Sequence, residues 1–391
     1  MKVVLGAYVL VLVFDACCSV RLFRYNGGVN IPEITRRVTR SLDVGGVAIG
    51  GAAPVRIQSM TNTPTRDATA TLAQIKRLAD AGAELVRVAV PTAADTAALG
   101  EIVAGSPVPI IADVHFHFDR ALEAIAAGVA KIRLNPGNIG DREQVMRIID
   151  AADAAGAAIR IGVNEGSVIE RKEGQQRSSD MAARLDALMV EKMAEYLEVF
   201  AVAGFERLVL SAKSHDAVTT VAVNRLLAGR WDFPLHLGVT HAGTAQTGAI
   251  RSAAALGTLL CEGIGDTIRI SYAGDPVAEV EAACELLASL RLRKRVGIEL
   301  IACPTCGRLE TDIDDIVEEV REALSDVVEP ITVAIMGCVV NGPGEAQHAD
   351  VAICAGKDKA ILYRRGERIR TVRADEIVEA VVAEARKAAG A

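Results

Sequence analysis

Aromatic side chains are scarce in this sequence of 391 residues, at 3% with a single Trp. The core must therefore be built from Val, Ile, Leu and Ala, the residues that fill parallel sheets covered by helices. Hydrophobic residues make up 51% and charged residues 24%, a composition that excludes an intrinsically disordered chain. At about 150 residues per domain, the length predicts one large domain and one small one.

An excess of positive charge is also absent. The formal net charge is −7 and the sequence pI is near 5.6. This balance excludes a general electrostatic attraction to nucleic acid or to an anionic membrane. An anionic ligand would have to be bound by a local cluster of Lys and Arg.

Cysteines and long hydrophobic runs are few. Eight cysteines are too sparse for a disulfide scaffold in a chain of this size, which favours a reducing cytoplasm. The apolar run 3–14 falls short of the roughly 20 residues that span a bilayer, and no clean cleavage site follows it. We expect neither secretion nor membrane anchoring. Residues 1–39 are expected to be an N-terminal extension, disordered or added by an upstream start-site assignment, and residues 1–30 to have no role in the fold.

Eight short runs rich in β-branched residues predict β-strands. They are residues 55–60, 85–90, 110–114, 132–135, 159–164, 208–213, 235–240 and 268–271. Ala-rich helical stretches lie between them, for example 69–81, 119–127 and 142–155. This alternation predicts an α/β fold, a (β/α)8 TIM-type barrel over residues 40–290, with an open doubly wound sheet as the alternative. The charged loop 165–177 is a candidate lid.

A small α/β domain is predicted for residues 291–391. Runs 298–302, 332–336 and 351–354 predict strands. Residues 312–324 carry apolar side chains on one helical face, and residues 375–389 predict a closing helix.

Cations recur at corresponding positions of the predicted barrel strands. Alternate residues of a strand share one face, and this period places Arg87, Arg133, Arg160, Lys213 and Arg269 inward or at the strand ends, with Asn135, Asn164, Ser211 and Ser271. Any one of these cations could be paired or exposed. Five together indicate a cavity for a multiply charged anion, most simply a diphosphate. Asp113 and His115 form either an acid/base pair or a hydrogen-bonded pair that orients a loop.

Three cysteines of the small domain are spaced as in a metal site. Cys303 and Cys306 form a CxxC pair, followed by Cys338 and, seven residues on, by Glu345. A CxxC pair also occurs in redox dithiols and in zinc sites, where His348 or Cys354 could be a fourth ligand. Three thiolates with one weaker oxygen ligand suit a [4Fe–4S] cluster with an exchangeable iron.

These motifs resemble the 4-hydroxy-3-methylbut-2-enyl diphosphate synthase family of the non-mevalonate isoprenoid pathway. The resemblance spans about residues 44–389. It is carried by residues 58–62 (QSMTN), 86–91 (VRVAVP), 112–116 (ADVHF), 133–140 (RLNPGNIG), 160–164 (RIGVN), 262–266 (EGIGD), 302–306 (ACPTC) and 336–345 (MGCVVNGPGE).

The resemblance implies an iron–sulfur oxidoreductase. It would reduce 2-C-methyl-D-erythritol 2,4-cyclodiphosphate by two electrons, opening the ring and losing water, with a ferredoxin or flavodoxin as electron donor. It implies a [4Fe–4S] cluster on Cys303, Cys306, Cys338 and Glu345. It places the substrate diphosphate among Arg87, Arg133, Arg160, Asn164, Lys213 and Ser271, with Asp113 and His115 nearby. It also implies a homodimer in which the cluster domain of one chain caps the barrel of the other.

One residue departs from the family pattern. Where the family usually has Thr-Glu-Ala-Gly after the seventh strand, this chain has Thr-His-Ala-Gly, with His241 in place of the Glu. A carboxylate that is thought to help catalysis is therefore an imidazole. We expect His241 to donate the proton, because imidazole is the side chain that titrates closest to neutral pH.

Two other classes of function are compatible with the sequence. A barrel lyase or isomerase acting on a phosphorylated substrate, with a structural zinc site in the tail, would be colourless and active in air. A non-enzymatic iron–sulfur sensor or scaffold would hold a cluster but would have no use for the barrel cations.

Overall fold

The computed structural model describes residues 33–114, 117–135, 141–168, 185–303, 306–338 and 342–390, together with three strands before residue 26. These strands are β1 (Lys2–Leu5), β2 (Tyr8–Phe14) and β3 (Val20–Tyr25). They pair in an antiparallel sheet of their own.

Eight parallel strands form a barrel, in the order β11-β10-β9-β8-β7-β6-β13-β12. They are β6 (Arg56–Met60), β7 (Leu85–Ala89), β8 (Ile110–Asp113), β9 (Lys131–Leu134), β10 (Ala158–Asn164), β11 (Leu208–Lys213), β12 (His236–Leu237) and β13 (Thr267–Ile268). A parallel bridge between Leu210 and Leu235 joins the two ends of this sheet. The barrel prediction is thereby confirmed over the open-sheet alternative.

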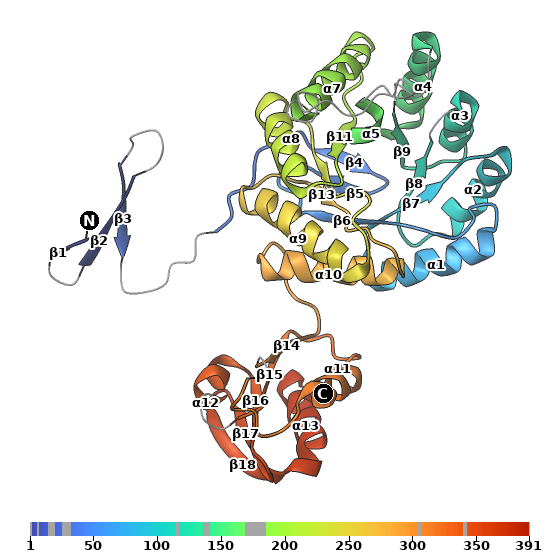
Figure 1. Cartoon of the computed structure of the whole chain (residues 1–391). Coiled ribbons are helices and arrows are strands. Elements are labelled where there is room, and N and C mark those ends of the chain that lie inside the picture. The colour runs from blue at the N-terminus through green and yellow to red at the C-terminus, as the bar shows by residue number, and fades with distance from the viewer. Residues whose placement is uncertain are drawn as a thin grey trace, which may run out of the picture.

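Helices surround the strands (Figure 1). They are α1 (Ala68–Asp80), α2 (Ala93–Gly105), α3 (Phe118–Ala126), α4 (Arg142–Ala155), α7 (Leu185–Val202), α8 (Ala217–Arg230), α9 (Ala245–Cys261) and α10 (Pro276–Ser289). Within the described residues, no helix is long and apolar enough to cross a membrane. The candidate lid begins in the short helix α5 (Glu165–Val168), and from residue 169 onward it lies outside the described residues.

A hairpin missed by the sequence analysis closes the amino end of the barrel. Strands β4 (Leu42–Val44) and β5 (Val47–Ile49) are joined by Gly45 and Gly46, whose φ angles of 62° and 89° suit a tight hairpin turn. The apolar side chains of the hairpin pack on the lowest inward residues of the strands, namely Leu85, Ile111, Ala158 and Val209. Strands of three residues are too short to show a periodicity in the sequence.

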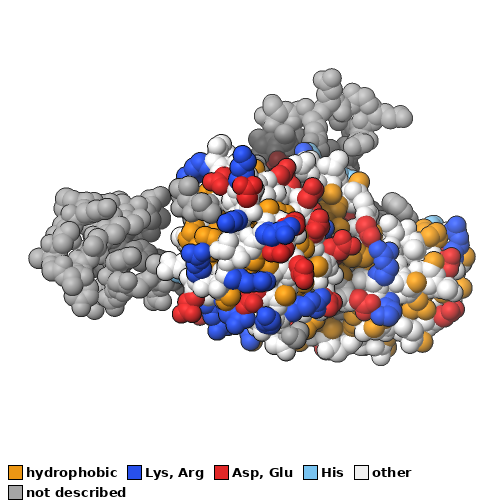
Figure 2. Space-filling model, turned by 90° about the horizontal axis from the view of Figure 1, so that it is seen from below, with side chains coloured by type: hydrophobic (Ala, Val, Ile, Leu, Met, Phe, Trp, Pro, Cys, Tyr) orange, Lys and Arg blue, Asp and Glu red, His pale blue; other side chains and the backbone are white. Residues whose placement is uncertain are grey.

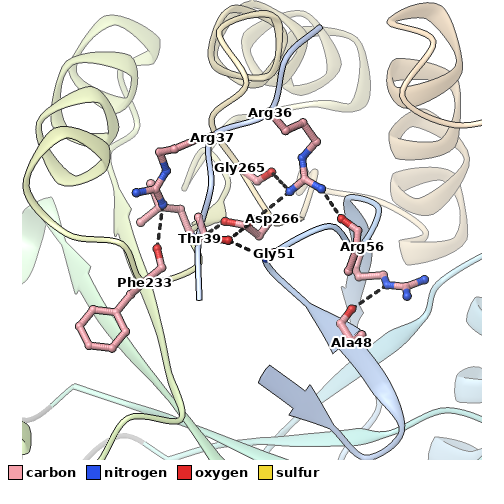
Figure 3. A network of polar contacts seen from close by, with 11 residues as sticks. Arg36, Arg37, Thr39, Ala48, Gly51, Arg56, Phe233, Gly265 and Asp266 are labelled. Carbon is pink, nitrogen blue, oxygen red and sulfur yellow. Dashed lines mark hydrogen bonds and ion pairs between the residues drawn. The ribbon is translucent and has the colours of Figure 1, made fainter. Parts of the chain in front are cut away.

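The segment before this hairpin is bonded to the base of the barrel (Figure 3). Arg36 Nη2 donates to Asp266 Oδ1 at 2.8 Å, and Thr39 Oγ1 donates to the same oxygen at 3.1 Å. Asp266 Oδ2 accepts the backbone N–H of Leu235 at 2.8 Å. Arg37 donates to the carbonyl oxygens of residues 231 and 233. Residues 36–39 therefore pack as part of the barrel, although the expected boundary lay at residue 40.

The C-terminal unit is a five-stranded sheet in the order β14-β15-β16-β17-β18. Strands β14 (Ile298–Ala302), β15 (Ile331–Met336) and β16 (Val351–Ala355) are parallel, whereas β17 (Lys359–Arg364) and β18 (Glu367–Arg373) form an antiparallel hairpin. Helices α11 (Asp314–Ala323) and α13 (Ile377–Ala389) pack with the apolar side chains of the sheet. The sequence analysis predicted these helices and the parallel strands but missed the hairpin, whose many arginines hide its strand pattern.

The Asp266 network generates a stability prediction. Asp266→Asn removes the charge that pairs with Arg36 inside the barrel base, and breaking a buried pair of this kind costs about 3 kcal/mol. Chemical denaturation should show this loss in the free energy of unfolding. The control Asp80→Asn breaks only an exposed pair with Lys76 and should cost less than about 1 kcal/mol. If Asp266→Asn were as stable as the parent, residues 36–39 would not be anchored by Asp266.

Deletion of residues 1–30 should leave the free energy of unfolding unchanged, because these residues are expected to have no role in the fold.

Candidate anion site and cysteine site

A cavity of about 120 Å³ opens at the carboxyl ends of the barrel strands. All six predicted substrate contacts line it, as does Asp113. The lining residues are Arg87, Asp113, Arg133, Arg160, Gly162, Asn164, Ser211, Lys213, Val239, Thr240, Arg269 and Ser271. The strand register explains the convergence, because Arg160 pairs with Arg133 and Asn164 with Lys213 on neighbouring strands. Paired residues of neighbouring strands point to the same face of a sheet.

Positive charge exceeds negative charge in this cavity. Asp113 lies 3.6 Å from the guanidinium groups of both Arg87 and Arg133. Glu279 of α10 lies 3.3 Å from Arg269. Among the described residues, five cations therefore meet two carboxylates. Burial lowers the pKa of Arg160 well below its usual range, and the neighbouring Arg87 and Arg133 lower it further.

Two glycines make room for these cations. A Cβ atom on Gly162 would lie 2.9 Å from Arg133 Nε, and one on Gly238 would lie 2.7 Å from Lys213 Nζ. Real Cβ atoms essentially never approach so closely, so a larger residue would displace the cation. The sequence analysis missed both glycines, although each lies two residues after an inward-facing residue, Arg160 or His236.

Glu279 was also missed by the sequence analysis. Besides contacting Arg269, it accepts the backbone N–H of Tyr272 at 3.0 Å. Glu279 thus fixes both the guanidinium group of Arg269 and the backbone next to Ser271. Burial raises the pKa of Glu279, and Arg269 opposes this shift.

A second polar layer lies inside the barrel beneath the cavity. Lys131 and His236 are fully buried, and Gln58 is 1% exposed. His236 Nδ1 lies 2.8 Å from Thr267 Oγ1. Burial lowers the pKa of Lys131 and of His236 well below their usual ranges, with Arg160 as the strongest charged contributor to both shifts. The layer therefore consists of buried polar groups below the charged cavity, where burial and the nearby cations disfavour a positive charge on Lys131 and on His236.

The two histidines predicted to act near the substrate differ in what the structure describes. His115 lies outside the described residues. His241 is exposed, directly after the lining residue Thr240, and has a φ angle of 52°. A left-handed conformation is uncommon for residues other than Gly, but His adopts it more often than most.

The outer surface lacks a comparable single-sign cluster on the face shown in Figure 2. Lys and Arg side chains are interspersed there with Asp and Glu. On this face, charge of one sign is therefore not gathered as it is in the cavity.

The predicted metal ligands lie at the ends of adjacent strands. Cys303 directly follows β14, and Cys338 comes two residues after the neighbouring strand β15. The backbone N–H of Gly337 donates to Cys303 Sγ at 3.1 Å. Within the described residues, no three Cys, His, Asp or Glu side chains form a metal-binding group. The side chain of Glu345, at the end of α12 (Gly342–Glu345), is not among those described.

Two further thiols of the small domain, Cys354 and Cys306, differ in their surroundings. Burial raises the pKa of Cys354 to about 12, and Cys338 and Cys303 add to this shift. Cys354 therefore remains a protonated, apolar-packed thiol, which argues against the sequence-based alternative of Cys354 as a fourth zinc ligand. Cys306 is exposed, and hydrogen bonds from Arg308 lower the pKa of its thiol. No disulfide joins the six described cysteines.

A TIM-type barrel with a cationic cavity, followed by a small domain with three cysteines after two adjacent strands, defines a class of two-domain proteins. Models of the two parts match this chain: the GcpE TIM-barrel domain over residues 39–284 and the GcpE protein C-terminal domain over residues 299–387. The chain belongs to the GcpE family.

Curated relatives cover nearly the whole chain. A 4-hydroxy-3-methylbut-2-en-1-yl diphosphate synthase (flavodoxin) of Geobacter sulfurreducens is 47% identical over 89% of this chain and 97% of its own length. The protein of the same name from Aquifex aeolicus is 46% identical over 90% of this chain and 97% of its own. Among solved structures, a Xanthomonas albilineans dihydropteroate synthase aligns with 65% of this chain and 98% of its own, at 15% identity and a TM-score of 0.45.

The close approach of Gly162 to Arg133 generates a prediction about anion affinity. Arg133→Ala should weaken binding of inorganic pyrophosphate by about 10- to 100-fold, since a hydrogen bond to a charged group contributes roughly 1.5–3 kcal/mol. Gly162→Ala should also weaken it, because the new methyl group displaces the guanidinium. Gly100→Ala on α2, where an added Cβ has no neighbour within 4 Å, is the control. Calorimetry would contradict the assignment if Arg133→Ala and Gly162→Ala both bound pyrophosphate like the parent and the control.

Proposed function

We propose that this chain catalyses the two-electron reductive ring opening and dehydration of 2-C-methyl-D-erythritol 2,4-cyclodiphosphate to 4-hydroxy-3-methylbut-2-enyl diphosphate. The observation that carries the proposal is the excess of buried cations in the barrel cavity, in a chain of the GcpE family. The names of relatives that match about nine-tenths of the chain support the same reaction. The protein is on this account an oxidoreductase of isoprenoid precursor synthesis.

The cavity would bind the diphosphate of the substrate. Arg87, Arg133 and Arg160 supply planar guanidinium groups that suit phosphate oxygens. The remaining contacts would come from Asn164, Lys213 and Ser271 at the strand ends. Asp113 fixes two of the arginines before the substrate arrives, so that little ordering remains to be done on binding.

A [4Fe–4S] cluster would be held by Cys303, Cys306, Cys338 and Glu345. Thiolate sulfur is the ligand type that such clusters require, and the N–H of Gly337 aimed at Cys303 Sγ is the kind of hydrogen bond that tunes them. When bound, the cluster supplies the electrons for the reduction. Gly342 is needed beside this site, because a Cβ there would lie 2.7 Å from Cys354 Sγ.

Loss of water requires a proton on the departing hydroxyl group. We assign this proton to His241, which follows Thr240 at the mouth of the cavity. His115 is the alternative proton donor. Asp113 would orient Arg87 and Arg133 and would not donate the proton itself. Among these groups, His241 is the one for which the family pattern has a carboxylate instead.

The proposed reaction needs an electron donor and a reducing compartment. The relatives' names specify flavodoxin, which we take as the electron donor, with a ferredoxin as the alternative. We expect a homodimer in which the cysteine domain of one chain caps the barrel of the other, since reduction needs the cluster beside the bound substrate. A reducing cytoplasm suits a site that depends on thiolates.

Loss of one cysteine ligand should remove the cluster. Cys338→Ser should abolish the brown colour that an iron–sulfur cluster gives the protein, together with the activity, because the substitution removes a thiolate ligand. Cys354→Ala and Cys261→Ser should keep both and serve as matched controls. Iron and sulfide analysis after anaerobic purification is the measurement, and a full iron complement in Cys338→Ser would refute the ligand set.

Glu345→Ala should differ in kind from the cysteine variants. Three thiolates can retain a cluster, so iron should partly survive while turnover collapses. Complete and equal loss of iron and of activity would count against an exchangeable oxygen ligand.

The proton donor can be tested at His241. His241→Ala should lower kcat by about 10²-fold, the low end of what general acid catalysis contributes, with KM little changed. His241→Glu restores the carboxylate of the family pattern and should retain most of the activity. Turnover of His241→Ala at the parent rate would make this residue a bystander.

A further inference from the structure

Lys213 differs from the other four cations of the cavity in one chemical respect. It lies at the end of β11, with Nζ so close to Gly238 that a Cβ added there would lie 2.7 Å from it. A guanidinium group stays protonated in proteins, whereas a lysine ammonium can lose its proton. Among the described residues that line the cavity, Lys213 is therefore the one cation that can relieve crowding of positive charge by becoming neutral.

The surroundings of Lys213 disfavour its charged form. Arg87, Arg133, Arg160 and Arg269 line the same cavity. The two described carboxylates beside these arginines already form ion pairs. Asp113 pairs with Arg87 and Arg133, and Glu279 pairs with Arg269. No described carboxylate lies within ion-pair distance of Lys213. Burial lowers the pKa of Lys213 well below its usual range, and the four arginines lower it further.

An anion in the cavity reverses this balance. Each phosphate of the cyclic diphosphate carries one ester bond and the shared bridge, so each has a single negative charge and no second ionisation near pH 6. Two negative charges beside Lys213 favour its ammonium form by direct attraction, which is strong in a cavity poorly screened by water. The ligand has no proton to give, so the proton must come from the solvent.

We propose that Lys213 is a neutral amine in the empty cavity and takes up one proton from solvent as the dianionic substrate binds. The amine and the proton form an ammonium group, and no other bond changes. This proposal rests on the proposed function for the identity of the ligand. Substrate affinity should therefore fall as the pH rises above the pKa of Lys213 in the empty cavity. Above that pH, binding requires uptake of a proton, and the proton concentration of the solution decreases as the pH rises.

Two other buried groups could compete for the same proton. Lys131 of β9 and His236 of β12 lie in the polar layer below the cavity, and both are fully buried. They do not line the cavity, so the anion acts on them from farther away than on Lys213. His241 is exposed, four residues after the end of β12, and is not among the residues that line the cavity.

Calorimetry of substrate binding tests the proposal. The oxidised, iron–sulfur-loaded chain is titrated with the cyclic diphosphate at pH 8 without reductant, in HEPES and in Tris, whose ionisation enthalpies differ. The dependence of the binding enthalpy on the buffer gives the protons taken up, and we expect about one for the parent. Lys213→Arg keeps a permanent cation and should bind with no uptake and with an affinity independent of pH. Lys131→Met should keep the uptake of the parent.

Three results would overturn the proposal: no uptake by the parent, undiminished uptake by Lys213→Arg, or loss of uptake in Lys131→Met alone. A second titration, with sulfate, separates this proposal from the proposed function, because sulfate does not titrate near neutral pH. Sulfate binding with uptake but no binding of the cyclic diphosphate would refute the substrate and support the role of Lys213. Binding of neither anion would refute both.

Discussion

Uncompensated positive charge inside the barrel is the constraint on which the rest of the structure depends. Buried cations are costly unless they meet anions. Among the described residues, the cavity gathers four arginines and Lys213 around Asp113 and Glu279. In the layer below it, burial disfavours the charged forms of Lys131 and His236. The fold must therefore hold together a set of groups that repel one another until a multiply charged ligand enters.

Several features far apart in the sequence resist this repulsion. The β4–β5 hairpin fills the base of the barrel with apolar side chains, and Arg36 with Asp266 fixes the segment that leads into it. Glu279 secures the last strand by bonding both Arg269 and the backbone of Tyr272. The glycines at 162 and 238 let two cations approach the backbone of neighbouring strands. Apolar packing at the base thus offsets electrostatic strain at the top.

The barrel was predictable because its strands repeat at regular intervals and its cations follow the period of two. The same period brought the six predicted contacts to one cavity. The β4–β5 hairpin was not predictable, since three-residue strands leave no pattern, and β17–β18 is masked by its arginines. Glu279 could not be found either, because its role depends on α10 placing it beside Arg269 and Tyr272 in the segment after β13, rather than on any local motif. The sequence places Cys303, Cys306 and Cys338 in one small domain. The distances between their side chains depend on the conformation of the loops that follow β14 and β15, which the sequence does not specify.

The division of labour between the two domains is the central claim: the barrel binds a dianion and the cysteine domain delivers electrons to it. The most direct test is a single anaerobic experiment on the full chain, reconstituted with iron and sulfide, reduced, and supplied with 2-C-methyl-D-erythritol 2,4-cyclodiphosphate. Product analysis by phosphorus NMR should show 4-hydroxy-3-methylbut-2-enyl diphosphate, with two electrons consumed per molecule formed. Recovery of unchanged cyclic diphosphate by a chain that carries its full complement of iron would contradict the account.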